Sequence, residues 1–205
     1  MLLDKGENST RLPRIFKHVA MALSFIHAKG VIHRDLKPAN ILLKTRNGPA
    51  CLCDFGTAWA TDDHHPDEPS NKKVIEIGTT CYRPPETLFG YRSYGTEVDI
   101  WALGCVIAEA ENGHPLFDSG ELGTDLRLIL SIFEYLGTPT LKSWPEAKDL
   151  PDFGKMLFNE FPVRPWESLL PNAGPAAVDL VKNMVTYSQH QRFSADQVLK
   201  HLYLI

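Results

Sequence analysis

The sequence has few cysteines, and none is spaced as in secreted disulfide-rich proteins. Four cysteines occur among 205 residues. Two of them, Cys51 and Cys53, lie in an apparent strand, where alternate side chains share a face but stand too far apart to bridge easily. We therefore expect reduced thiols rather than a disulfide or metal framework, which is typical of an intracellular protein.

Long hydrophobic runs and an excess of positive charge are also missing. The longest strongly apolar stretch, residues 100–108, has nine residues, whereas a bilayer span needs about twenty. Residues 1–8 contain no apolar run of signal-peptide length. The net charge is −4, so no nucleic-acid or membrane partner is expected. These absences favour one intracellular globular domain, in the nucleus or the cytoplasm.

Hydrophobic periodicity predicts a mainly helical domain with one small β-hairpin. Two short apolar runs, residues 41–43 and 50–53, are separated by Asn47-Gly48, a strong hairpin-turn signal. A long polar segment, residues 57–74, is typical of a mobile loop. The predicted helices cover residues 11–29, 98–110, 122–136, 175–187 and 194–202.

The most informative segment is residues 33–40, His-Arg-Asp-Leu-Lys-Pro-Ala-Asn. Asp54-Phe55-Gly56 follows fourteen residues after Asn40. An Asp, a Lys and an Asn on one short loop, with a second Asp downstream, can hold a nucleotide's phosphates, two magnesium ions and a hydroxyl nucleophile together. These two motifs in this order are the signature of protein kinases.

The chain resembles the C-terminal lobe of a eukaryotic protein kinase over essentially all of its length. The resemblance implies a mainly α fold, the C-lobe of the α+β protein-kinase fold, with a small β-hairpin near the catalytic loop. It divides residues 1–205 into a catalytic loop at 33–40, an activation segment at 54–86 and a group-specific insert at about 138–175.

Within the kinases, the chain is most similar to the cyclin-dependent-kinase and MAP-kinase (CMGC) group. Lys37 after His-Arg-Asp-Leu is the pattern of serine/threonine kinases. The motifs that carry the group resemblance are Tyr82-Arg-Pro-Pro-Glu86, Asp99-Ile-Trp-Ala-Leu-Gly-Cys105, Leu136-Gly-Thr-Pro139 followed by Trp144-Pro145, and Arg192-Phe-Ser-Ala195.

The resemblance implies ATP and Mg²⁺ as cofactors and assigns the chemistry to a few residues. Asp35 is the expected catalytic base, which accepts or orients the proton of the substrate hydroxyl. Lys37 is expected to neutralise charge on the transferred phosphoryl group. Asn40 and Asp54 match the two protein ligands of Mg²⁺, whose other ligands are waters and ATP phosphates. Leu42 resembles the apolar floor under adenine, with an ordinary core leucine as the alternative.

Other residues are implied to position the loop and the substrate. Thr79 resembles the threonine that bridges the substrate-binding loop to the catalytic Asp and Lys; the alternative is an ordinary loop hydroxyl. Arg34 resembles the arginine that receives a phosphate from the activation loop. Gly78 and Arg83 lie where the group forms a pocket for the proline after the phosphorylated residue. The implied scaffold residues are the packing pair His33 and Phe55, the buried ion pair Glu86 and Arg192, and Asp99, which holds the catalytic-loop backbone.

Two departures from the kinase pattern bear on activity. Residues 1–30 contain only the glycines Gly6 and Gly30, so they supply no glycine-rich phosphate loop, and no nucleotide-pairing lysine is recognisable there. We therefore expect the small lobe to be absent and this chain alone to have little or no kinase activity. Val74 occupies the place of the activating threonine, and Ser70 is a nearby hydroxyl at the wrong offset.

Two functions follow from these observations, and the sequence leaves both open. The first is a cyclin-dependent-kinase-like serine/threonine kinase that acts on protein substrates with a proline-directed preference and binds a cyclin or another regulatory subunit. The second is a non-catalytic docking module with a kinase-like fold. An upstream glycine-rich loop and Ala-x-Lys strand would favour the first, whereas a verified start at Met1 with stable expression would favour the second.

Overall fold

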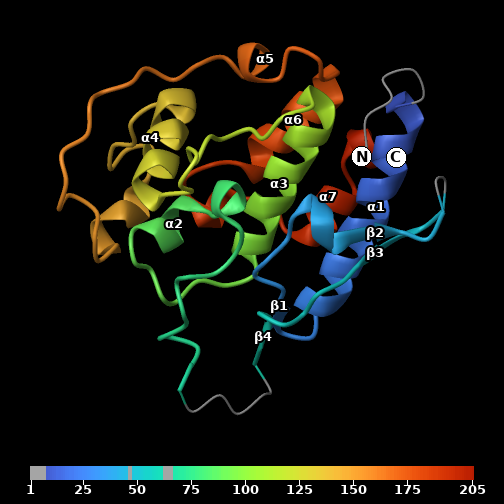
Figure 1. The fold of residues 1–205 in the computed structure, drawn as a ribbon, viewed down its shortest axis with the longest axis horizontal. Coiled ribbons are helices and arrows are strands. Elements are labelled where there is room, and N and C mark those ends of the chain that lie inside the picture. The colour runs from blue at the N-terminus through green and yellow to red at the C-terminus, as the bar shows by residue number, and fades with distance from the viewer. Residues whose placement is uncertain (1–7, 46–47, 62–66) are drawn as a thin grey trace.

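The computed structural model describes residues 8–45, 48–61 and 67–205, and the described part is mainly helical (Figure 1). Short 3-10 turns connect several of the elements. The helices are α1 Asn8–His27, α2 Pro85–Leu88, α3 Glu97–Asn112, α4 Asp125–Leu136, α5 Trp166–Leu169, α6 Pro175–Met184 and α7 Ala195–Leu199. The strands are β1 Val31–Ile32, β2 Ile41–Leu43, β3 Ala50–Leu52 and β4 Trp59–Ala60.

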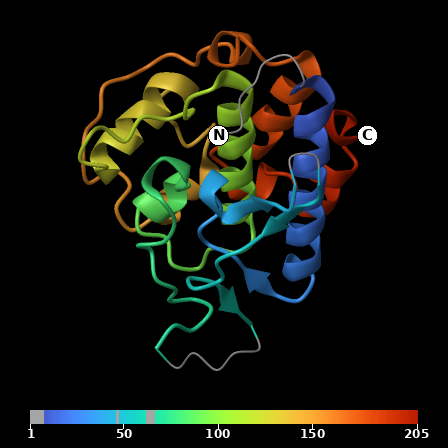
Figure 2. The same cartoon turned by 45° about the vertical axis from the view of Figure 1, so that its right-hand side comes forward.

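Helix α3 is the centre of the fold. It is apolar on nearly all sides, and Trp101, Leu103 and Ile107 are fully buried, as expected for a helix without a polar face. Helix α6 packs against it, and α1 also contacts it (Figures 1 and 2). The helix ends at Gly113, whose φ of 88° is favourable for glycine but not for other residues. The buried helix predicted at residues 98–110 is therefore confirmed, with slightly longer ends.

The described strands form two small antiparallel sheets beside the catalytic-loop segment. Strand β2 pairs with β3, with Leu42 opposite Cys51, which confirms the two predicted strands of the hairpin. Asn47 of the predicted turn lies outside the described residues. Strand β1 pairs with β4, with Ile32 opposite Trp59. The sequence prediction missed this second pairing because β4 lies inside the segment predicted as a mobile loop.

Several helix ends differ from the predicted ones because caps and turns override the hydrophobic period. Helix α1 ends at His27, and α6 ends at Met184. Helix α4 begins at Asp125 because the Thr124 side chain caps it by accepting from the Arg127 N–H at 3.3 Å. Helix α7 is limited to five residues after a capping box at Ser194, and the chain then turns and continues as a short 3-10 helix.

Aromatic packing holds the long irregular connection that follows α4. Phe89 contacts Phe133, Trp144 and Phe153 with ring centroids 6.2, 5.9 and 5.3 Å apart. Trp144 is itself almost completely buried. Edge-to-face and offset pairs at these separations stabilise a core beyond the burial of their area. This cluster packs the first part of the predicted insert against α4, and the insert itself contains only a 3-10 helix at Pro145–Asp149 and the short helix α5.

The state of the thiols and the character of the helices can be compared with what the composition predicted. All four cysteines are free thiols. Burial raises the pKa of the Cys81 and Cys105 thiols, so neither is a reactive thiolate near neutral pH. No helix within the described ranges combines the length and the apolar character needed to cross a membrane.

Candidate active site

The catalytic-loop motif is held from beneath by the buried carboxylate of Asp99, in the first turn of α3. Asp99 accepts hydrogen bonds from the backbone N–H groups of His33 at 2.9 Å and Arg34 at 2.8 Å. The Nε2 atom of His27 lies 2.8 Å from the same carboxylate. Arg34 has a φ of 70°, a left-handed conformation that costs energy for a residue with a side chain. The carboxylate thus holds a strained turn in place immediately before Asp35.

Asp35, Lys37 and Thr79 form one hydrogen-bonded cluster. The Lys37 ammonium donates to Asp35 Oδ2 at 2.6 Å and to Thr79 Oγ1 at 2.9 Å. The Thr79 hydroxyl donates in turn to Asp35 Oδ1 at 2.9 Å. Thr79 contacts both charged groups of the catalytic loop although it lies 42 residues after Lys37. The alternative of an ordinary loop hydroxyl does not fit this geometry.

Asn40 lies directly behind this cluster and connects it to the Asp-Phe-Gly motif. Its amide nitrogen donates to the Asp35 carbonyl at 2.8 Å and to Asp35 Oδ2 at 3.2 Å. The backbone carbonyl of Asn40 accepts a hydrogen bond from the backbone N–H of Cys53 at 3.0 Å. The next residue, Asp54, has a φ of 64° and an exposed side chain. Asn40 and Asp54 are therefore brought to neighbouring positions by the backbone pairing just before the motif.

The donor set of Asn40 and Asp54 fits Mg²⁺ delivered with a nucleotide. An amide oxygen and an exposed carboxylate are hard oxygen ligands, which suit a cation that keeps several waters and binds phosphates. Within the described ranges, no group of three or more His, Cys, Asp and Glu side chains is placed to hold a metal ion. The oxygen ligands thus favour an ion shared with a phosphate group over a metal centre built from protein ligands alone.

His33 and Phe55 pack against each other, which links the catalytic loop to the Asp-Phe-Gly motif. Their ring centroids are 4.8 Å apart at an interplanar angle of 66°, an edge-to-face contact. The His33 ring also lies 3.0 Å from the Cys53 carbonyl through Nε2. His33 is fully buried, so a displacement of Phe55 in the Asp-Phe-Gly motif would also displace His33 in the catalytic loop.

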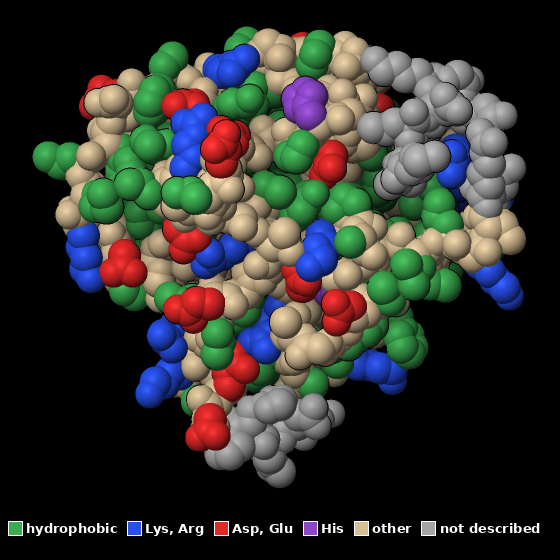
Figure 3. Space-filling view, viewed as in Figure 1, with side chains coloured by type: hydrophobic (Ala, Val, Ile, Leu, Met, Phe, Trp, Pro, Cys, Tyr) green, Lys and Arg blue, Asp and Glu red, His purple; other side chains and the backbone are tan. Residues whose placement is uncertain are grey.

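Leu42 is exposed on the small sheet rather than buried in the core. Its side chain is 54% exposed, and that of Phe55 is 45% exposed. Figure 3 shows hydrophobic side chains gathered on the part of the surface that carries β2 and β3. The alternative of an ordinary core leucine is therefore wrong for Leu42. An apolar surface at this position is compatible with a floor under a flat, apolar group.

Gly78 and Arg83 lie next to Arg34 of the catalytic-loop motif. Gly78 has a φ of 75°, and a Cβ at this position would lie 3.2 Å from the Arg34 carbonyl oxygen, so only glycine fits without strain. The Arg83 guanidinium donates to Asp125 and, at 3.0 Å, to the Ile75 carbonyl. These contacts fix the side chain of Arg83 across the start of α4.

Glu86 and Arg192 form an ion pair in the interior. The two guanidinium nitrogens donate to the two carboxylate oxygens at 2.6 and 2.7 Å. Glu86 lies in α2, at the end of the predicted activation segment, so the pair joins this part of the chain to the C-terminal helices.

Sequence reasoning missed three residues that support the site. His27 contacts Asp99, and Glu68 and Tyr94 both contact the Arg34 guanidinium. Burial raises the pKa of Tyr94 to about 12, so its hydroxyl stays protonated. These contacts span 72, 34 and 60 residues of sequence respectively, so no local pattern reveals them.

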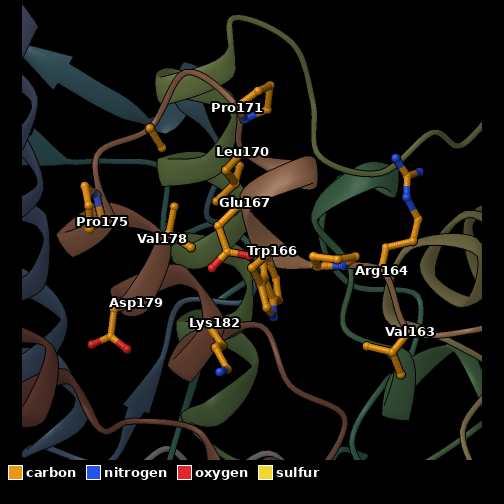
Figure 4. Close-up of a pocket in the computed structure, with 12 residues that line it drawn as sticks. Val163, Arg164, Trp166, Glu167, Leu170, Pro171, Pro175, Val178, Asp179 and Lys182 are labelled. Carbon is orange, nitrogen blue, oxygen red and sulfur yellow. The ribbon is translucent and has the colours of Figure 1, made fainter.

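A separate cavity of about 750 Å³ lies between the insert and α6. Figure 4 shows Trp166 and Glu167 near its middle, with Leu170 above, Val178 to the left and Lys182 below. Its lining includes none of the predicted site residues. This cavity is therefore not part of the candidate site around the catalytic loop.

Comparisons with known proteins agree with the motifs. The family model described as Protein kinase domain matches residues 5–204. Serine/threonine-protein kinase csk1 of Schizosaccharomyces pombe is 43% identical over 178 residues, which cover 85% of this chain and 58% of that protein. Cyclin-dependent kinase 20 of Homo sapiens is 39% identical over 201 residues, which cover 98% of this chain and 55% of that protein.

A solved structure is also similar. The crystal structure of the yeast RNA Pol II CTD kinase CTDK-1 complex matches with a TM-score of 0.85 and 31% identity, over 98% of this chain and 65% of that chain. The chain spans about half the length of the curated relatives that it matches. The family model covers nearly the whole chain, so it gives no support to the expectation that only one lobe is represented. By this match and these identities, the chain belongs to the protein kinase family and is similar to its serine/threonine, cyclin-dependent-kinase-like members.

Proposed function

We propose that this chain forms the catalytic and substrate-binding part of a serine/threonine protein kinase that transfers a phosphoryl group from ATP to a protein hydroxyl. The single observation that carries the proposal is the cluster in which Thr79 joins Asp35 to Lys37, with contacts of 2.6 to 2.9 Å. It provides a proton acceptor and a cation at one point, as phosphoryl transfer requires.

Each residue of the cluster has one role in the proposed reaction. Asp35 accepts a hydrogen bond from the substrate serine or threonine hydroxyl, orients its oxygen and takes up its proton. Lys37 presents its ammonium group to the negative charge of the transferring group. Thr79 bonds to both side chains and so holds them in one arrangement before the substrate arrives.

Asn40 and Asp54 would hold Mg²⁺ together with the nucleotide phosphates, and Leu42 would lie beneath the adenine ring. When bound, Mg²⁺ and ATP supply charge neutralisation at the phosphate oxygens and the phosphoryl group itself. The chain contributes the oxygen ligands and the exposed apolar surface at positions that the hairpin and the Asn40–Cys53 backbone contact set.

We also propose that residues 1–205 correspond to the helical C-terminal lobe of the kinase fold. The proposed parts are a catalytic loop at 33–40, an activation segment at 54–86 and an insert at about 138–175. The support is the mainly helical character of the described residues, whose strands form only two-stranded sheets. The exposed apolar surface around Leu42 and Phe55 is then the face that a strand-rich lobe covers.

The proposed partners are protein substrates and a regulatory subunit. Gly78, with its φ of 75° beside Arg83, supports a preference for proline after the phosphorylated serine or threonine. The name of one relative, cyclin-dependent kinase 20, supports a cyclin as the regulatory partner.

A non-catalytic docking module is the second candidate function. The observation that favours it is the exposure of Leu42 and Phe55, at 54% and 45%, beside an otherwise complete loop. Such a surface suits a protein partner as well as a covering lobe.

A Mg-ATP phosphorylation assay separates the two candidates. We would compare this chain with the same chain joined to any coding sequence directly upstream, each beside an Asp35→Asn variant and an Asp149→Asn control at an exposed position. The kinase proposal expects transfer by the extended protein, a loss of about 10²- to 10⁴-fold with Asp35→Asn, and no loss with the control. Transfer by neither protein, with no lysine-bearing strand upstream, would favour the docking module.

A further inference from the structure

The Arg34 guanidinium is almost fully enclosed and already has an anionic partner. Only 8% of the Arg34 side chain and 16% of the Glu68 side chain are exposed. One terminal nitrogen donates to Glu68 Oε1, and the other donates to Glu68 Oε2 at 3.3 Å. The remaining contacts go to the Thr57 carbonyl and, at 3.3 Å, to the Tyr94 hydroxyl. This two-pronged pairing is the geometry in which arginine binds a carboxylate or a phosphate most strongly.

Glu68 also ties together the two halves of the activation segment. Its Oε1 accepts from the Val74 N–H at 2.8 Å, downstream of Glu68 itself. Its backbone carbonyl accepts from the Trp59 indole at 3.0 Å, upstream in β4. Through Arg34, the same residue reaches the catalytic loop. One residue therefore connects the loop to both sides of the segment, through its carboxylate to Arg34 and Val74 and through its backbone carbonyl to Trp59.

A second buried cation, the Lys73 ammonium, holds the middle of the activation segment against residues 92–94. Lys73 is 3% exposed, its ammonium donates to the Tyr94 carbonyl at 2.8 Å, and it lies 4.5 Å from the centre of the Trp59 ring. The Lys73 N–H donates to the Arg92 carbonyl at 3.0 Å. The segment is thus packed against residues 92–94 in the same arrangement that places Glu68 on Arg34.

This arrangement leaves little role for an added phosphate. A phosphate group carries about −1.5 to −2 charges, and to pair with Arg34 it would have to displace the Glu68 carboxylate. Val74 has no hydroxyl, and Ser70 is exposed and contributes its backbone carbonyl to Lys73 rather than its hydroxyl to Arg34.

We propose that Glu68 is a positioning residue that supplies a permanent negative charge to Arg34, so that the activation segment is ordered against the catalytic loop without phosphorylation. The inference rests on the proposed kinase function for its effect on turnover. Its structural part, the ordering of residues 67–79 by one carboxylate, stands by itself.

Hydrogen exchange on the unmodified 205-residue chain tests the structural part. We would treat the chain with phosphatase and compare it with Glu68→Gln, which removes the charge at nearly constant size. Glu76→Gln is the matched control, because Glu76 is an exposed glutamate of the same segment. We expect exchange of the Val74 amide and tryptic cleavage after Lys72 to be on the order of tenfold faster or more in Glu68→Gln, given the strength of charged hydrogen bonds, and unchanged in Glu76→Gln. Equal rates in the two variants would overturn the inference.

Kinetics on the extended protein of the phosphorylation assay test the effect on turnover. We expect phosphatase treatment and Ser70→Ala to leave kcat unchanged, Glu68→Gln to lower kcat more than it alters KM for ATP, and Glu68→Asp to restore part of the loss. A loss of activity on phosphatase treatment or with Ser70→Ala would overturn the inference, because a phosphate would then supply the charge. If no protein transferred phosphate, the proposed function would fail, whereas the exchange rates would still decide the role of Glu68.

Discussion

Glu86 and Arg192 lie 106 residues apart in the sequence and pair through two hydrogen bonds of 2.6 and 2.7 Å in the interior. Both side chains are buried almost completely. The guanidinium also donates to the Thr186 carbonyl at 3.0 Å and lies 4.9 Å from the centre of the Trp101 ring. Each of the three guanidinium nitrogens of Arg192 therefore donates a hydrogen bond. The pair joins the end of the proposed activation segment to the last helices.

Removing one partner of this pair should destabilise the fold strongly. Glu86→Ala leaves a buried guanidinium without its counter-charge, and we expect a loss of about 3–5 kcal/mol in the free energy of unfolding. Urea unfolding of the purified chain measures it. Arg127→Ala, which removes a surface arginine paired with Asp118, is the control and should cost less than about 1 kcal/mol. Similar losses for the two variants would show that the Glu86–Arg192 pair is not structurally important.

Asp99→Asn should loosen the catalytic loop. The carboxylate accepts from the N–H groups of His33 and Arg34 and contacts His27, whereas an amide has one accepting oxygen and would leave a buried donor unpaired. We expect a loss of about 1–3 kcal/mol and faster hydrogen exchange at His33 and Arg34. Exchange at wild-type rates would contradict the role given to Asp99.

Thr79→Val should lower kcat while the protein remains folded. The substitution removes the hydroxyl that bonds to Asp35 and Lys37 at 2.9 Å but keeps the branched shape. We expect kcat of the extended protein to fall by about 10- to 100-fold, since small displacements of reacting groups are costly. Thr79→Ser keeps the hydroxyl and should retain most of the activity. If Thr79→Ser lost as much as Thr79→Val, the hydroxyl would not be the relevant group.

Gly104→Ala should be destabilising although it lies in a helix, where alanine is normally favoured. A Cβ at this position would lie 2.6 Å from Val185 Cγ2 and 2.9 Å from Met184 Cβ, so α3 and α6 would have to separate. We expect a loss of about 1–3 kcal/mol in urea unfolding. Gly174→Ala is the matched control, because no atom lies within 4 Å of its Cβ position, and it should cost below about 1 kcal/mol. A stabilised Gly104→Ala variant would show that the helices are less tightly packed.

The carboxyl group of Asp118 should titrate below its ordinary pKa. The Gly120 N–H donates to it at 2.8 Å, and the Arg127 guanidinium donates to it at 2.9 and 3.0 Å, which lowers its pKa from 3.8. Because the folded pKa lies below the unfolded one, the stabilisation is present above about pH 4 and is lost as the pH falls through the folded pKa. An NMR titration of the carboxyl carbon checks the midpoint, which Arg127→Met should raise. A midpoint at or above 3.8 would contradict this prediction.

The local chemistry of the site could be predicted from the sequence. Asp35, Lys37 and Asn40 lie within six residues on one loop, so their contacts follow from short-range geometry once the motif is identified. The hairpin of β2 and β3 and the buried helix α3 could also be predicted, because period and turn residues act over short distances. The predicted start of α4 was wrong because the Thr124 side-chain cap, rather than hydrophobicity, decides where that helix begins. The predicted end of α7 was wrong because the chain turns after Leu199 and continues as a 3-10 helix.

Only the tertiary structure decided which distant residues complete the site. The Thr79 hydroxyl meets Lys37 across 42 residues, and Glu68 meets Arg34 across 34. For Thr79 the sequence left an ordinary loop hydroxyl open, and for Arg34 it indicated a phosphate from the activation loop rather than the Glu68 carboxylate. Such contacts depend on how the activation segment packs on residues 92–94 and on α3, and packing of this kind is set by many weak contacts rather than by a local pattern. The sequence by itself determined the chemical groups and their local order, whereas long-range packing determined which charges face one another.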